Sequence, residues 1–175
     1  SHMGLSSGDN PKETQDIETG LLGIEGSNNA QGYTISKVLA NSPAHRDESK
    51  LEIGDTIVSV NQQSVLNQNL HALLNGQVNT PVLLEVMRGS QQRSGAESTT
   101  EEVVIWPVSS LRNELYDDWV NERRRLTEKY SNGRLGYLHI RGMNWSSFER
   151  FERELMAAGY GKDGIVIDVR YNGGG

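Results

Sequence analysis

The sequence predicts a mostly β domain with one short helix, followed by a long charged helix and a β-α-β unit at the carboxyl end. Three observations support this fold class. Short alternating or apolar segments separated by turn residues fill positions 20 to 107. A strongly charged segment with helical periodicity follows Pro107. Beyond it, two apolar strand patterns flank a second helical pattern, which is the order of a parallel crossover unit.

Composition narrows the function. The 175 residues carry a net charge of −6, so no general attraction to nucleic acid is expected. No apolar run approaches the roughly 20 residues that span a bilayer. The chain has no cysteine, which excludes disulfides and thiolate metal sites. We expect no cofactor, no metal site, no nucleic acid and no membrane as partners; the compartment, cytoplasmic or periplasmic, stays open.

The amino-terminal residues are set aside from the fold. Ser1, His2 and Met3 resemble the remnant of a cleaved expression tag, and the polar, Gly/Ser-containing residues after them have no strand or helix pattern. Residues 1–16 are therefore expected to be a tag remnant and disordered leader. The rest is divided into a β domain at 17–108, a connecting helix at 109–132 and the start of a second domain at 133–175.

The first domain is expected to form a small β-barrel or sandwich. Its strands are predicted at 33–39, 56–60, 82–87 and 102–106, after a brief apolar stretch at 21–24. A helix is predicted at 66–75, where Leu66, Leu70 and Leu73 share one face and Asn67, His71 and Leu74 lie on the adjoining face. The polar segment 89–100 is expected to be a flexible hairpin excursion.

The connecting helix carries acidic residues early and arginines later, which matches the helix dipole. Ser109 or Ser110 is expected to cap it. Leu111, Leu115 and Trp119 form an apolar stripe. Because acidic residues surround the arginines, a solvated connecting helix is favoured over a nucleic-acid site.

The last segment predicts strand, helix and strand. The strands are expected at 134–140 and 165–169, and Ser146 to Glu149 have the pattern of a capping box that starts the intervening helix. Short links make this a right-handed parallel crossover. The terminal glycines then lie at the carboxyl end of a parallel strand, where ligands of open α/β sheets gather.

Three interpretations of the terminal sequence Asn-Gly-Gly-Gly remain open. It can be a flexible turn, a phosphate cradle or an oxyanion donor. The phosphate motif lacks its lysine and hydroxyl residues, which disfavours the second. Asp168 and Arg170 point to one face of the strand and are expected to form a structural ion pair.

The segment 116–175 resembles the start of the catalytic domain of the tricorn protease family, within the tail-processing serine peptidases. The resemblance rests on an ordered set of motifs: Asp-Trp-Val at 118–120, three arginines at 123–125, Gly-Tyr-Leu-His-Ile at 136–140 and Ile-Asp-Val-Arg-Tyr-Asn-Gly-Gly-Gly at 167–175. It implies an α/β peptidase core that this chain enters but does not complete.

The first domain resembles PDZ domains, which these peptidases carry. The similar motifs are Gly-Leu-Leu-Gly-Ile at 20–24 and Gly-Asp-Thr-Ile-Val-Ser-Val-Asn at 54–61. The resemblance implies that a peptide adds a strand along Ile24 and onward, with its carboxylate over the amides of Leu21, Leu22 and Gly23. Asn67, His71 and Leu74 are then expected to form the opposite wall of the groove.

The resemblance also implies a division of catalytic roles. Gly175 is the expected oxyanion-hole residue, and Gly174 is the second candidate. The nucleophilic Ser and the base His of the family match no position in this sequence. His139 is expected to be structural. The chain alone should be inactive, and its parent would hydrolyse short peptides or unfolded chains by a serine peptidase mechanism. The family's ring assemblies leave an oligomeric parent open.

The alternative from another class is a non-catalytic PDZ adaptor that binds peptide C-termini, with the second half serving assembly. In either case a short parallel sheet should leave an apolar face uncovered, including Val166 and Leu138, and an open edge that favours self-association.

Overall fold

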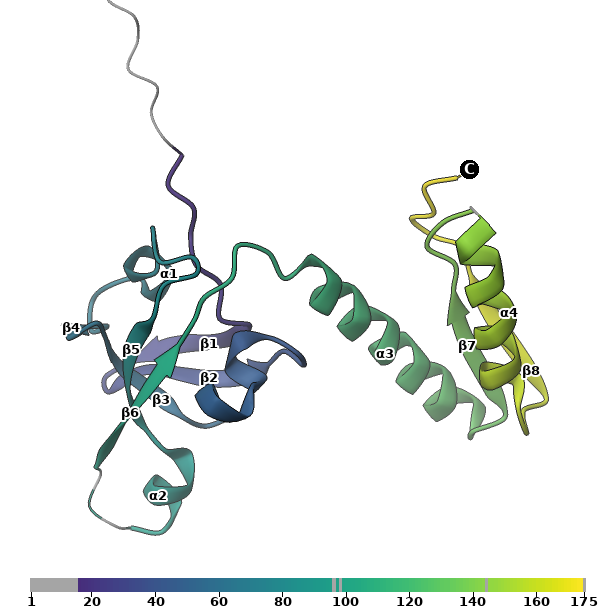
Figure 1. Cartoon of the computed structure of the whole chain (residues 1–175). Helices are drawn as coiled ribbons and strands as arrows, with labels where there is room; N and C mark the ends of the chain where they lie inside the picture. Colours follow the sequence, from purple (N-terminus) through teal and green to yellow (C-terminus); the bar gives the residue numbers. More distant parts are fainter. Residues whose placement is uncertain (1–15, 96, 98, 144, 175) are drawn as a thin grey trace, which may run out of the picture.

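The computed structural model describes residues 16–95, 97, 99–143 and 145–174, so residues 1–15 of the expected tag remnant and leader at 1–16 lie outside them. An antiparallel sheet with strand order β1-β2-β3-β5-β6, and β4 paired to β3, forms the first unit (Figure 1). The strands are β1 (Ile24–Asn29), β2 (Gly32–Val38), β3 (Thr56–Val60), β4 (Gln63–Ser64), β5 (Val82–Met87) and β6 (Thr100–Ile105). Between β2 and β3 lie two 3-10 turns, η1 (Pro43–His45) and η2 (Asp47–Ser49).

The first unit has a closed apolar core, as the alternating strands predict. In β5 the side chains of Val82, Leu84 and Val86 are fully buried, and those between them are half-buried. Ile35 from β2 and Ile57 from β3 pack into the same cluster. The predicted strands at 33–39, 56–60, 82–87 and 102–106 are all present, to within two residues.

The prediction of a helix at 66–75 is mostly wrong. Only α1 (Leu70–Leu73) is helical, with the Asn69 side chain accepting a hydrogen bond from the His71 amide. Asn67 has a positive φ of 57°, which breaks a helix at that point. Leu66 is therefore exposed, whereas Leu70 and Leu74 are buried. The segment 89–100 also differs, since it begins with α2 (Gly89–Arg93).

The predicted connecting helix is confirmed as α3 (Arg112–Ser131), which ends at Asn132 in the left-handed region. No residue within it is fully buried. The N-cap position is Leu111, which makes no side-chain capping bond, so the prediction that Ser109 or Ser110 caps the helix is wrong. Ser110 precedes the cap, and its hydroxyl accepts a hydrogen bond from the Arg112 amide. Figure 1 shows α3 running from the first sheet to the second unit.

The second unit contains β7 (Leu135–His139), α4 (Trp145–Gly159) and β8 (Gly164–Asp168). β7 and β8 pair in parallel, which confirms the predicted pairing. Helix α4 begins before Ser146, so the expected capping residue lies inside the first turn. Leu138 is buried, which corrects its expected exposure, because β7 packs against both α3 and α4. Val166 of β8 is 42% exposed, as expected, and Ile167 on the opposite face of the strand is 45% exposed.

The buried carboxylate of Asp55 fixes the turn before β3. It accepts hydrogen bonds from the amides of Glu52 and Gly89 and from the Arg88 guanidinium at 2.8–3.0 Å. Arg88 also pairs with Glu101, whose side chain is 48% exposed.

Replacement of Asp55 by Ala should lower the free energy of unfolding by about 3 kcal/mol, because it leaves two amides and a partly buried guanidinium without their partner. Glu101→Ala removes the exposed partner of the same arginine and should cost less than about 1 kcal/mol. Urea denaturation followed by circular dichroism measures both. Equal losses for the two variants would show that Asp55 has no special role.

Candidate peptide groove and glycine loop

Strand β1 is an edge strand, and the groove beside it is bounded on the far side by the α1 segment. Two cavities follow this edge. The first, about 140 Å³, is lined mostly by apolar side chains. The second is open and more polar, and includes Gly26 to Ala30 of β1 and its turn together with 66–71. His71 lines both cavities, so the two lie next to each other along the groove.

The carboxyl-binding end of the expected groove lies at Leu21 to Gly23. The Leu21 amide donates to the Val108 carbonyl at 2.8 Å, so it is already engaged. For the amides of Leu22 and Gly23, no acceptor is found among the described residues. Gly23 has a φ of +84°, and a Cβ there would overlap the Ser42 side chain. Only glycine fits this turn. The neighbouring amides of Leu22 and Gly23 are available to bind an anion.

The structure brings the predicted peptide-binding residues to the groove, though not in the expected way. Asn67 lines the polar cavity from a loop, and exposed His71 lines both cavities. Leu74 is 1% exposed and forms the floor of the apolar cavity together with buried Leu22. Ile24, half-buried, lines the same cavity at the start of β1.

Five further residues line the apolar cavity and were not predicted there. They are Glu25, Lys37, Leu39, Leu111 and Leu115. Leu111 and Leu115 were recognised as part of the apolar stripe on the connecting helix. A stripe alone does not indicate which surface it contacts, because that depends on the packing of α3 against the first sheet.

The glycine loop follows β8. Gly174 has a φ of +74°, and its amide donates to the Asn172 side chain at 2.7 Å. Asn172 in turn donates to the Ile140 carbonyl, which ties the loop to the end of β7. Gly175, the preferred oxyanion candidate, lies outside the described residues. The amide of the fallback, Gly174, is engaged by Asn172 in this structure.

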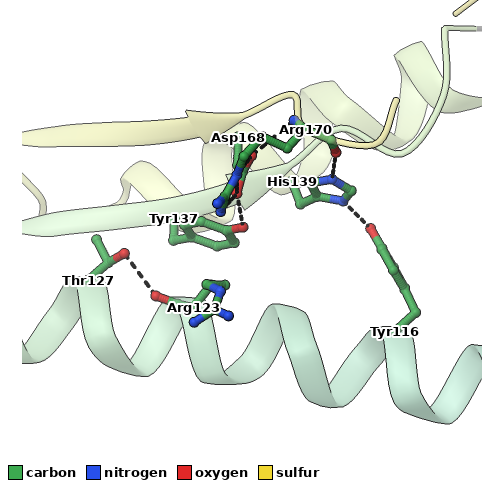
Figure 2. A network of polar contacts seen from close by, with 7 residues as sticks. All are labelled: Tyr116, Arg123, Thr127, Tyr137, His139, Asp168 and Arg170. Atoms are coloured by element: carbon green, nitrogen blue, oxygen red, sulfur yellow. Dashed lines mark hydrogen bonds and ion pairs between the residues drawn. The ribbon is translucent and has the colours of Figure 1, made fainter. Parts of the chain in front are cut away.

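A polar network holds the start of this loop (Figure 2). His139 is 7% exposed, and its Nε2 lies 2.7 Å from the Arg170 carbonyl oxygen. A carbonyl oxygen only accepts, so Nε2 carries the hydrogen, and in the neutral ring Nδ1 accepts from the Tyr116 hydroxyl at 2.7 Å. Burial raises the pKa of Tyr116, which keeps its hydroxyl a donor. This agrees with the structural role expected for His139.

Asp168 and Arg170 form the ion pair that the strand pattern predicts, with an N–O distance of 2.6 Å. Tyr137 donates a further hydrogen bond to Asp168 at 2.7 Å. The Arg170 hydrogen bonds hold the pKa of Asp168 far below its ordinary value. Burial, with the neighbouring carboxylate, raises the pKa of Tyr137. Both groups therefore keep one protonation state near neutral pH, which suits a structural support rather than an acid or base.

Two other kinds of site find no support in the described part of the chain. No group of three or more His, Cys, Asp or Glu side chains is placed to hold a metal ion there. Among the described helices, none is long and apolar enough to cross a membrane.

The sequence is similar to known proteins in both of its parts. The PDZ domain family model matches residues 11–87. Tricorn protease homolog 1 of Streptomyces coelicolor is 33% identical over 166 residues, which cover 89% of this chain and 15% of that protein. The tricorn protease homolog of Saccharolobus solfataricus is 28% identical over 151 residues, or 82% of this chain and 13% of that protein. The chain thus spans about a seventh of the length of these relatives.

The fold is similar as well. A crystal structure of the tricorn protease superimposes with a TM-score of 0.71 at 23% identity, covering 90% of this chain and 15% of the other. Most of the chain thus shares the fold of a small part of that protease. The chain contains a PDZ domain, and with the segment that follows it resembles the tricorn proteases in sequence and in fold.

Proposed function

We propose that the parent of this chain is a tricorn-like serine peptidase and that the PDZ domain binds or gates its peptide substrates. The observation that supports this best is the groove beside β1, an unpaired strand edge that ends at two available amides. A peptide C-terminus offers both partners, a backbone that extends the sheet and a carboxylate that accepts from the amides. The similarity to tricorn proteases supplies the peptidase half of the proposal.

The glycine loop is proposed as one wall of the oxyanion hole. In acyl transfer, a backbone amide aimed at the developing negative oxygen stabilises the tetrahedral intermediate. The loop follows a parallel strand and has no side chains at 173–174 that would block an approaching carbonyl group. Gly175 remains the proposed donor, with Gly174 second, since the Asn172 side chain would have to release the Gly174 amide.

The proposed domain boundaries follow from the same arrangement. Residues 17–108 are assigned to the PDZ domain because Leu21 and Val108 form a bridge that joins its two ends. Residues 109–132 are the connecting helix, and 133–175 begin the peptidase core. The nucleophile and base are assigned to parts of the parent outside this chain, so these 175 residues alone should not hydrolyse peptides.

Peptide binding should depend on a free carboxylate. Fluorescein-labelled peptides ending in valine should bind at least about tenfold more tightly with a free C-terminus than with an amide, because charge-assisted hydrogen bonds are lost. Fluorescence anisotropy measures the two affinities. Gly23→Ala should abolish the difference in affinity, because the added Cβ would overlap the Ser42 side chain and displace the amides of this turn. Equal affinities for both peptides in the unaltered chain would contradict a carboxylate-binding groove.

The peptidase half is tested separately, on the full-length parent protein. A fluorophosphonate probe should label one serine outside the present 175 residues, and the 175-residue chain should stay unlabelled. Mass spectrometry identifies the modified residue. If the full-length protein is not labelled while free-carboxylate peptides still bind, the non-catalytic PDZ adaptor is the correct interpretation.

His139 should hold the glycine loop in place. In His139→Ala, trypsin should cleave after Arg170 and release residues 171–175 about fivefold faster. The lost hydrogen bond to the Arg170 carbonyl contributes about 1 kcal/mol to holding this segment against β7. Tyr116→Phe removes the hydroxyl but leaves this bond, and should have a smaller effect. Mass spectrometry of the released peptide follows the rate. An unchanged rate in His139→Ala would rule out this positioning role.

A further inference from the structure

The first turns of α3 lie against the apolar end of the peptide groove. Leu111, Leu115 and Asp118 follow at intervals of four and three residues, which places them on one face. Leu111 is buried, and the Asp118 carboxylate pairs with Lys37 of β2 at 2.6 Å. Leu115 is 54% exposed, yet it lines the apolar cavity. The helix therefore adds a third wall to a groove that β1 and α1 otherwise form.

The size and lining of the cavity limit what it can hold. Its volume is about 140 Å³. For comparison, an engineered apolar cavity of about 150 Å³ accepts one benzene molecule. Most of its lining side chains are aliphatic: Leu21, Leu22, Ile24, Leu39, Leu74, Leu111 and Leu115. A space of this kind suits one aliphatic side chain and is too small for an indole ring together with the backbone that carries it.

The charged side chains around the cavity are not suited to bind the carboxylate of a peptide, which leaves backbone amides as its partners. Lys37 lines the cavity but already pairs with Asp118 at 2.6 Å. Glu25 also lines it and would repel an anion placed beside it. The available amides of Leu22 and Gly23 are thus the better place for a carboxylate, with the last side chain of the peptide directed into the apolar cavity.

We propose that Leu115, with Leu111, determines which peptides the groove accepts, by closing the pocket for the C-terminal side chain around aliphatic residues of valine to leucine size. This inference rests on the proposed peptide-binding function. It assigns specificity to a helix outside the matched PDZ segment, so the domain alone and the domain with α3 should differ in selectivity. Leu115 is suited to this role because its exposed half is available for the ligand to cover.

The test measures selectivity as a ratio of affinities. Labelled peptides that differ only in a final Val or Trp are titrated by fluorescence anisotropy against the whole chain. The unaltered chain should favour the Val peptide by about tenfold or more, the discrimination expected of a filled apolar pocket. In Leu115→Ala the ratio should fall to about one, because the enlarged pocket admits the ring and loses contact with valine.

A second variant changes the pocket in the opposite direction. Leu115→Phe should narrow it, so that a peptide ending in Ala binds more tightly than one ending in Val. Leu126→Ala is the matched control: it makes the same substitution on the same helix, at a residue that faces β7 and β8 instead. It should leave the Val to Trp ratio unchanged.

The outcomes separate this inference from the function on which it rests. If free-carboxylate peptides bind better than amides but neither Leu115 variant alters selectivity, the inference is overturned and the groove function stands. If carboxylate and amide peptides bind equally, or if neither binds, both fail. A change in Leu126→Ala as large as that in Leu115→Ala would also overturn it, because the effect would then come from the helix as a whole.

Discussion

The first three turns of α3 contact both units of the molecule, and both candidate sites depend on these contacts. One face places Leu115, with Leu111 at the N-cap, in the lining of the candidate peptide groove, and Asp118 beside Lys37. A neighbouring face carries Tyr116 to His139 and, through it, to the glycine loop. Helical geometry makes this double contact possible, since residues one apart point about 100° from each other. A single rigid element thus sets the positions of two loops that are distant in sequence.

The contacts on the two faces differ in strength and in purpose. Lys37 and Asp118 are each more than a third exposed, so their ion pair contributes little to stability and mainly orients the helix. His139 and Asp168 are buried, and the hydrogen bonds that satisfy them specify one arrangement of β7, β8 and the following loop. Removing one member would leave a buried polar group unsatisfied, whereas the exposed pair can be exchanged for water at small cost.

Much of the fold could be predicted from the sequence because burial leaves a clear pattern. Strands such as β5 alternate, α3 is periodic over 20 residues, and the parallel pair follows from short links around α4. The α1 segment could not be predicted well. Leu66, Leu70 and Leu73 fit a helix by spacing alone, but Asn67 takes a left-handed conformation that no spacing rule detects.

The candidate sites were predictable only where a motif is local. The turn at Gly23 and the groove residue His71 were located from sequence, since each lies within a short recognisable segment. Leu111 and Leu115 as a groove wall, and the bond from Tyr116 to His139, depend on how distant elements pack. The residue pattern alone did not indicate strand β1, because its sequence, IEGSNN, is mostly polar and exposed. Only the resemblance to PDZ domains pointed to a strand edge from Ile24 onward.

The glycine loop is shaped by hydrogen bonds rather than by packing. A Cβ added at Gly173 or Gly174 would meet no atom within 4 Å, so no steric contact selects their conformation. What selects it lies before them: Asn172 binds the Ile140 carbonyl and the Gly174 amide, and His139 binds the Arg170 carbonyl. The direction in which the loop amides point is therefore set by side chains outside the glycines. Any oxyanion site here must be held by β7 and α3, and its glycines supply only access and amides.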